Sequence, residues 1–349
     1  MAQLQPEFIL PDGGDGDGGV GCYVTGTRLT APEGVVGVED VAVGTMVLTA
    51  SGESRAVRWV GHRTVNCTLS PDPASVWPIQ IKAGAFADQQ PSRDLWLSPG
   101  HSIFVSGVLI QAEKLINGAT IVQVPTESIE YWHVELDQHD VLLAEGLAAE
   151  SYLDQGNRTA FVNGGAFVEA HPDFKPKHWA ETCAPLVMEG AVVESVRTSL
   201  LARAQQLGYQ ITADSEAHIL ADGQRIEPVF LREDRLAFML PAQCSTIELR
   251  SRSFVPAHVQ PANDDLRSLG LCVGRLQVDG NDLQLDDDTA FSEGWHRCET
   301  AAAGTRWRWS RERAALPSNS RLIVIDLHGR GHYWRTEPGA PCAVITRSA

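Results

Sequence analysis

The stretch "GGVGCYVTGTRLTAPEG", residues 18–34, decides how the first part of the chain is interpreted. A cysteine, Cys22, directly follows a glycine and directly precedes an alternating run that is typical of a β-strand. Gly21 has no side chain, so its carbonyl carbon is open to attack by the neighbouring sulfur, and glycine tolerates a strained peptide. Cys22 is therefore either a small buried residue or a nucleophile that acts on the peptide bond before it.

If Cys22 acts as a nucleophile, its reaction requires two helper groups. Attack of a thiol on the preceding peptide is an N-to-S acyl shift, which needs a proton donor for the leaving nitrogen and a group that polarises or twists the carbonyl. The stretch "WLSPGHSIFV", residues 96–105, offers Ser98 and His101 on a turn between two apolar runs. A histidine can protonate the nitrogen, and a hydroxyl can fix the local backbone. Taken alone, His101 also fits a hydrogen-bonded histidine at the start of a strand.

Four blocks of sequence, in order over residues 22 to about 153, resemble the Hint (hedgehog/intein) family of self-processing domains. The opening block "CYVTGTRLTAPEGVVGVEDVAVGTMVLTASG" begins with the cysteine, and "RAVRWVGHRTV" is similar to the strand that follows. The third block, "SPGH", is similar to the Thr-x-x-His block of the family, with Ser98 in the position of the threonine. The fourth, "IEYWHVELDQHDVLLAEGLAAES", resembles the closing strands. The resemblance implies an all-β Hint fold.

The same resemblance implies roles for individual residues. Cys22 corresponds to the nucleophile, His101 to the histidine that contacts and protonates the scissile amide, and Ser98 to its partner. His133 stands near the position where many inteins have an aspartate, which makes it a second candidate for acid–base work. The alternative for His133 is a strand residue beside Trp132 with no role.

Departures from the family pattern limit the expected reaction. A splicing intein ends its domain in His-Asn, whereas this sequence has Glu150 and Ser151 there, so splicing is not expected. His62 stands about where a hedgehog domain has the aspartate that activates a sterol, so sterol transfer is not expected either. Water, a thiol or an amine remain as acceptors of the acyl group.

The chain of 349 residues suits two domains. We expect a flexible acidic leader over residues 1–21, a Hint-like autoprocessing domain over 22–155, a linker over 156–190 and a β-rich domain of unread function over 191–349. One helix is expected after the linker, from apolar residues at helical spacing followed by Gly208 as a stop: Val193, Val196, Leu200, Leu201, Ala204 and Leu207. The remainder alternates like the strands of a β-sandwich.

Charge and composition restrict the partners. The net charge of -16 disfavours nucleic acid and anionic surfaces, and no apolar run is long enough for a membrane helix. The first ten residues lack the features of a Sec signal, and seven scattered cysteines are typical of free thiols in a reducing compartment. The expected location is cytoplasmic, or secreted without an N-terminal Sec signal.

Two further groups of residues are candidate sites. His133, Asp137, His139 and Asp140 are close in sequence but lack a tight ligand spacing, so no metal or other cofactor is predicted. In the second domain, Trp295, Trp307 and Trp309 fit either a stacking platform for a glycan or the core of a sandwich. The alternation of Trp307 and Trp309 favours the core.

The sequence thus predicts a self-processing cysteine autoprotease that acts once, cleaving between Gly21 and Cys22. Its substrate is its own leader, and water or a small nucleophile is the acyl acceptor. The alternative is a Hint fold kept as a structural or secretion-associated module that does not cleave.

Overall fold

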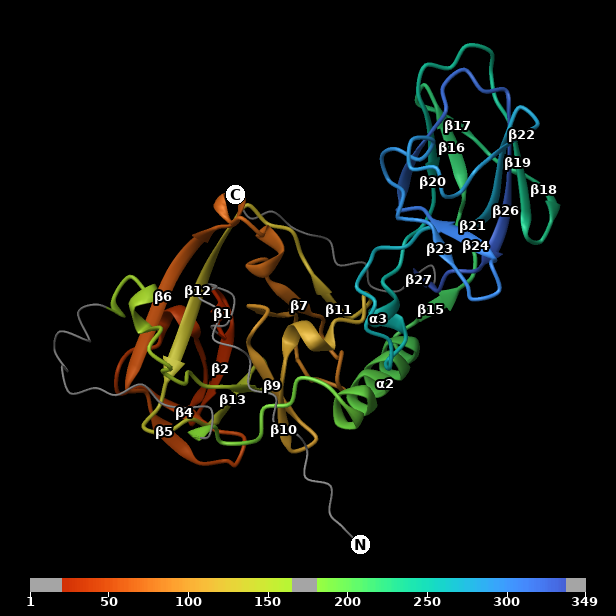
Figure 1. The fold of residues 1–349 in the computed structure, drawn as a ribbon. Helices are drawn as coiled ribbons and strands as arrows, with labels where there is room; N and C mark the ends of the chain where they lie inside the picture. Colours follow the sequence, from red (N-terminus) through yellow and green to blue (C-terminus); the bar gives the residue numbers. More distant parts are fainter. Residues whose placement is uncertain (1–20, 165–180, 337–349) are drawn as a thin grey trace, which may run out of the picture. The chain divides into compact units, whose positions relative to one another are not determined.

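The computed structural model describes residues 21–164 and 181–336, and the chain divides into two compact units, Met1–Gln206 and Leu207–Ala349 (Figure 1). The expected leader over residues 1–20 and the central part of the expected linker, residues 165–180, lie outside the described residues.

The first unit is built from two six-stranded sheets of antiparallel strands and a smaller hairpin. One sheet has the order β11-β7-β8-β1-β12-β6, the other the order β10-β9-β14-β13-β2-β3, and β4 pairs with β5. The strands are β1 (Tyr23–Val24), β2 (Arg28–Ala31), β3 (Gly34–Gly37), β4 (Met46–Leu48), β5 (Ser54–Ala56), β6 (Trp59–Asn66), β7 (Ile79–Ile81), β8 (Leu95–Leu97), β9 (Ser102–Val105), β10 (Val108–Gln111), β11 (Ile121–Gln123), β12 (Ser128–Glu135), β13 (Val141–Ala144) and β14 (Leu147–Glu150). Short 3₁₀ helices connect them: η2 (Val38–Asp40), η3 (Cys67–Leu69), η4 (Pro73–Ser75), η5 (Ala112–Leu115) and η6 (Arg158–Ala160).

The apolar positions of both sheets meet in one core. Leu97 and Ile79 of the first sheet and Leu29, Ile103 and Leu142 of the second are fully buried in it. Burial of a side chain of this size contributes about 1.5–3 kcal/mol. This shared core fixes the ends of the strands, which carry the polar residues described below.

The register of β1 places Cys22 between two other strand ends. Tyr23 pairs with Leu97 of β8 on one side and with Trp132 of β12 on the other. Because these pairs are antiparallel, the residue before Tyr23 lies opposite the residues that follow Leu97 and Trp132. Strand β1 begins one residue after Cys22, so the cysteine directly precedes the first strand, as the sequence predicts.

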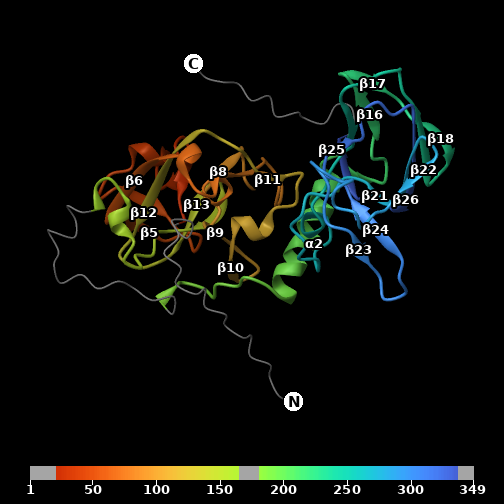
Figure 2. The ribbon, with the colours of Figure 1, turned by 45° about the horizontal axis from the view of Figure 1, so that its top comes forward.

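Helix α2 (Ala191–Gln206) packs on the core of the first unit. Its buried residues Val193, Val196 and Leu200 join that core, and the helix contacts η5 (Figure 2). Gly208 follows the helix with a φ of 92°, as expected for a stop. The helix itself matches the predicted periodicity, but the predicted domain start at residue 191 differs from the division after Gln206. The reason is that the apolar face of α2 covers the first core.

The end of the expected linker is also tied to the first unit. The Leu109 N–H of β10 donates to Pro185 O at 2.8 Å, and the Val187 N–H donates to Leu109 O at 2.9 Å. Leu186 thereby forms a parallel bridge with Leu109. This part of the segment 156–190 is a bound extension of the sheet.

The second unit is a sandwich of two antiparallel sheets. A four-stranded sheet has the order β17-β16-β20-β25, and a seven-stranded sheet has the order β18-β19-β26-β21-β24-β23 with β22 on β21; β15 pairs with β27. The elements are β15 (Tyr209–Thr212), β16 (His218–Ala221), β17 (Gln224–Ile226), β18 (Val229–Arg232), β19 (Arg235–Met239), β20 (Ile247–Arg250), α3 (Pro256–Val259), β21 (Cys272–Val278), β22 (Asn281–Leu283), β23 (Glu299–Thr300), β24 (Arg306–Trp309), β25 (Arg313–Leu316), β26 (Leu322–Gly329) and β27 (Tyr333–Thr336). Ile219 and Leu249 of one sheet share a core with Phe238, Val273 and Ile325 of the other. The predicted β-sandwich-like architecture is confirmed.

The tryptophans of β24 correct one expectation. Trp307 and Trp309 are only half-buried, and the residue between them, Arg308, is the buried one. Trp307 stacks on His328 at a centroid distance of 4.7 Å, and Trp309 packs on a separate small cluster that includes Phe254.

Arg308 takes the inward position because its guanidinium finds partners there. It donates to His296 O at 2.6 Å and to Leu285 O at 2.8 Å, and it also pairs with Asp288. Trp295 does pack against the sandwich core, as predicted, and its indole N–H donates to Ala315 O at 2.8 Å.

Candidate active site

Cys22 is held by polar groups on both of its flanks. Its backbone N–H donates to Ser98 Oγ at 2.7 Å, and the Ser98 N–H donates back to Cys22 O at 2.9 Å. Its Sγ lies 3.2 Å from His133 Nε2. Ser98 follows β8 and His133 lies on β12, so these contacts follow from the pairing of β1. The Cys22 nitrogen therefore contacts the hydroxyl of Ser98, whereas the sequence expectation gave that contact to His101.

His101 lies on the Gly21 side of the same peptide bond. A Cβ atom placed on Gly21 would lie 3.1 Å from His101 Cα and 3.5 Å from its Cγ. The ring packs against Tyr23 with a centroid distance of 4.4 Å, and neither ring nitrogen makes a hydrogen bond of good geometry with a described residue. The fold thus brings together the four predicted residues, Cys22, Ser98, His101 and His133, around the Gly21–Cys22 peptide.

Burial keeps the three titratable groups of this cluster uncharged at neutral pH. It raises the pKa of the Cys22 thiol to about 12, although the nearby charge of Arg63 acts in the opposite direction. Burial also lowers the pKa of His101 to about 4 and that of His133 well below its usual value. These pKa shifts favour a thiol with neutral imidazoles over a thiolate–imidazolium pair.

Aromatic side chains orient the ring of His133. Tyr152 packs on it at a centroid distance of 4.7 Å and Phe161 at 4.9 Å, the latter edge to face. Both residues, with Cys22, belong to a small buried cluster outside the main core. This packing holds Nε2 towards the sulfur.

A carboxylate that the sequence analysis left without a role lies beside Gly21. Glu150 ends β14, and its Oε1 lies 2.8 Å from the position of a Cβ on Gly21. The same oxygen accepts the Ser102 N–H at 2.7 Å, and Oε2 lies 3.5 Å from His139 Nε2. Burial alone raises the pKa of the Glu150 carboxyl, but the contact with His139, the neighbouring His101 and the Ser102 N–H outweigh burial and lower it.

His139 connects this carboxylate to the segment that follows the domain. In the neutral ring, Nδ1 accepts the Cys183 N–H at 3.1 Å, so the ring proton is on Nε2 and faces Glu150. Burial alone lowers the pKa of His139, but contacts with Cys183 and Glu150 outweigh it and raise that pKa to about 9. Protonation of Nδ1 breaks the hydrogen bond from the Cys183 N–H, which only the neutral ring can accept.

The remaining candidates lie apart from this site. His62 stacks on Trp132 at 5.0 Å, and Asp137 and Asp140 pair with Arg55. Within residues 21–164 and 181–336, no group of three or more His, Cys, Asp or Glu side chains is arranged to hold a metal ion.

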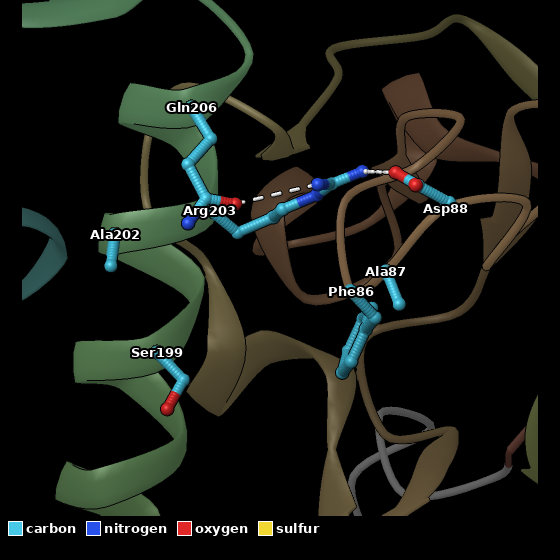
Figure 3. A pocket seen from close by; sticks show the side chains of 7 residues that line it. All are labelled: Phe86, Ala87, Asp88, Ser199, Ala202, Arg203 and Gln206. Atoms are coloured by element: carbon cyan, nitrogen blue, oxygen red, sulfur yellow. Dashed lines mark hydrogen bonds and ion pairs between the residues drawn. The ribbon is translucent and has the colours of Figure 1, made fainter.

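An open groove of about 510 Å³ lies on another part of the first unit, between α2 and the loop after β7 (Figure 3). Arg203 crosses it to pair with Asp88 at 2.6 Å and to donate to Gly84 O at 2.8 Å. Its lining residues are Phe86, Ala87, Asp88, Ser199, Ala202, Arg203 and Gln206, none of which contacts Cys22 in the site above.

The sequence from residue 21 to residue 156 matches the family model described as the Hint domain. Residues 21–156 form a Hint domain. The predicted resemblance to the Hint family is thereby confirmed. No curated protein sequence matches the chain. No helix in the described part of the chain is long and apolar enough to cross a membrane.

Solved intein structures are similar to the Hint domain at low identity. The MchDnaB-1 intein is 16% identical and covers 37% of this chain and 98% of its own, with a TM-score of 0.28. A DnaB intein from Synechocystis sp. PCC 6803 is 12% identical, with coverages of 38% and 98% and a TM-score of 0.27. A bacterial intein-like domain from Clostridium thermocellum is 13% identical, with coverages of 38% and 97% and a TM-score of 0.28.

Proposed function

We propose that the Hint domain cleaves its own chain once, between Gly21 and Cys22, by an N-to-S acyl shift followed by transfer of the acyl group to an external nucleophile. The observation that carries this proposal is the contact of Cys22 Sγ with His133 Nε2 at 3.2 Å, on a residue whose own backbone nitrogen is held by Ser98. A nucleophile and a base in hydrogen-bond reach, next to a glycine carbonyl, are what the shift requires.

In the first step His133 takes the proton of the Cys22 thiol, and the sulfur attacks the carbonyl carbon of Gly21. The tetrahedral intermediate collapses with cleavage of the C–N bond, and the Cys22 nitrogen takes a proton from His101. As His101 gives up this proton, it receives the proton that His133 took from the sulfur, directly or through water, so both rings end neutral. The product is a thioester between Gly21 and Cys22 with a free α-amino group on Cys22.

Ser98 fixes the leaving nitrogen during this step. Its hydroxyl accepts the amide N–H at 2.7 Å, which orients the peptide with respect to both imidazoles. Because burial raises the pKa of the Cys22 thiol to about 12 and lowers the pKa of His133 well below its usual value, the Cys22 thiolate–His133 imidazolium form is rare in the resting domain. We therefore expect slow spontaneous cleavage that a strong nucleophile draws to completion.

Splicing is not part of the proposal. Glu150 and Ser151 stand at the end of β14 in place of His-Asn. Ser151 is buried, its N–H donates to Asp140 O at 2.8 Å and its Oγ accepts the Asp140 N–H at 2.9 Å. Ser151 therefore closes the β13–β14 hairpin. The acyl group is released by an acceptor from outside the chain.

The test is treatment of the purified chain with hydroxylamine, followed by intact mass spectrometry. We expect loss of the segment that ends at Gly21, and no loss in Cys22→Ala, because no nucleophile remains. Cys67→Ala is the matched control, since Cys67 is another fully buried thiol of the same unit. A wild-type chain that keeps its full mass would favour the non-cleaving module, and cleavage in Cys22→Ala would contradict the mechanism.

A further inference from the structure

Glu150 has the position and the solvent contact that a hydrolytic base needs. Its Oε1 is 2.8 Å from the Cβ position of Gly21, so it touches the residue whose carbonyl becomes the thioester. Its side chain keeps 12% exposure, whereas Cys22 is 0% and His101 1% exposed. Among Cys22, His101 and Glu150, the Glu150 side chain is thus the most exposed to solvent.

The surroundings of Glu150 hold it as an anion in a fixed orientation. The Ser102 N–H binds Oε1 at 2.7 Å, and His139 faces Oε2 at 3.5 Å. The pairing of Ala149 in β14 with Ile103 in β9 sets this arrangement, because it brings the end of β14 beside the residues that follow His101. A carboxylate held by two donors keeps lone pairs available for a further proton donor.

We propose that Glu150 is a catalytic base that activates water for hydrolysis of the Gly21–Cys22 thioester, with His139 as its positioning residue. The inference rests on the function proposed above and names the acyl acceptor, which the sequence left open between water, a thiol and an amine. Water gives one proton to Glu150 as its oxygen bonds to the Gly21 carbon. The C–S bond then breaks, and the departing sulfur takes the proton from Glu150. The products are a carboxyl group on Gly21, the Cys22 thiol and the original carboxylate.

A purely structural role makes a different prediction from the catalytic one. Glu150→Gln keeps an oxygen that can accept the Ser102 N–H but removes the basic carboxylate. Hydroxylamine attacks a thioester without needing a base from the protein. A catalytic Glu150 is therefore required for cleavage by water and not for cleavage by hydroxylamine, whereas a Glu150 that only supports the fold affects both reactions alike.

The experiment compares the full chain with Glu150→Gln, His139→Gln and Glu113→Gln in water labelled with heavy oxygen, with and without hydroxylamine. Glu113 is the control because it is a partly exposed glutamate of the same unit, paired with Lys114. In Glu150→Gln we expect cleavage by water to fall by about 10²-fold or more, the usual contribution of a general base, with hydroxylamine cleavage retained. His139→Gln should show a smaller loss of the same kind. The labelled oxygen should appear in the carboxyl group of Gly21.

Three results separate the two proposals. Wild-type hydrolysis rates in Glu150→Gln would overturn the role of Glu150. Cleavage of the wild type by hydroxylamine without any hydrolysis in water would also overturn it, since the acceptor would then not be water. Failure of the wild type to react with hydroxylamine would instead overturn the cleavage mechanism itself.

Discussion

Cys22 Sγ and His133 Nε2 lie 3.2 Å apart although they are separated by 111 positions in the sequence. The antiparallel pairing of Tyr23 with Trp132 brings them together, because Cys22 directly precedes Tyr23 and His133 directly follows Trp132. His133 is a basic group within hydrogen-bond reach of the thiol, so we assign to it the role of taking the thiol proton.

His133→Phe tests this pair. Phenylalanine preserves the aromatic packing on Tyr152 and Phe161 but cannot take the thiol proton. We expect hydroxylamine-driven cleavage to slow by about 10²-fold or more, as is usual when a general base is lost. The measurement is the cleavage rate by mass spectrometry.

His62→Phe is the control for that variant. His62 lies on the neighbouring strand β6, and its ring stacks on Trp132 of β12. It should cleave at the wild-type rate. Equal rates in wild type and His133→Phe would show that the contact between His133 and Cys22 has no catalytic role.

Gly21→Ala tests how closely the site fits the residue before the bond. The new methyl group would lie 2.8 Å from Glu150 Oε1 and 3.1 Å from His101 Cα. Neither the bound Glu150 carboxylate nor the His101 backbone can move away freely, so the peptide shifts and cleavage slows by about 10²-fold. Gly329→Ala, where the nearest atom is Cys272 Sγ at 3.8 Å, should leave the rate unchanged. An unaffected Gly21→Ala rate would contradict the observed packing.

The stability of the first unit should fall in acid because of His101. Its pKa is about 6.5 when unfolded and about 4 when folded, so below pH 6.5 the unfolded chain binds the proton more readily. The contribution of the neutral His101 to the free energy of unfolding is complete above pH 6.5 and is lost as the pH falls through about 4. The full contribution is about 3 kcal/mol. His139, Glu150 and Tyr23 face the ring and remain in the variant. His101→Phe should therefore show a shallower loss of unfolding free energy in urea between these pH values. An unchanged slope would contradict the burial of a neutral His101.

Helix α2 should stabilise the first unit. Leu200 is buried in its core, so Leu200→Ala should lower the unfolding free energy by about 2–5 kcal/mol in urea titrations. Val192 is 40% exposed on the same helix, and Val192→Ala should change it by no more than about 0.5 kcal/mol. If the two substitutions lowered the unfolding free energy equally, the apolar face of α2 would not be buried in that core.

The sequence predicted the parts of the site that have local signals. Cys22 stands after a glycine, Ser98 and His101 share one turn, and the closing block carries His133. Glu150 was missed because its approach to Gly21 depends on the pairing of β14 with β9, which no local pattern encodes. The one available signal was the replacement of His-Asn by Glu-Ser, which was interpreted only as a loss of splicing.

Elsewhere the misjudged features depend on which surface a side chain meets. The period of α2 was predicted correctly, but its apolar face covers the first core and not the second. In β24 the alternation was also predicted correctly, yet the inward face carries Arg308, because three acceptors there satisfy its guanidinium. A periodic pattern shows which residues share a face of a helix or strand. Which face is buried depends on the surface that the element packs against.

The thioester itself is the central claim, and trapping it with free cysteine is its most direct test. Thiol exchange followed by S-to-N rearrangement would give an N-terminal fragment that ends in Gly21 plus one added cysteine, and a second chain that begins at Cys22. Mass spectrometry of both fragments distinguishes this from cleavage by a contaminating protease, which leaves an unmodified Gly21 carboxyl group. The account predicts the cysteine adduct in the wild type and its absence in Cys22→Ala. Cleavage of the wild type that yields no cysteine adduct at all in excess free cysteine, or an adduct that persists in Cys22→Ala, would contradict it.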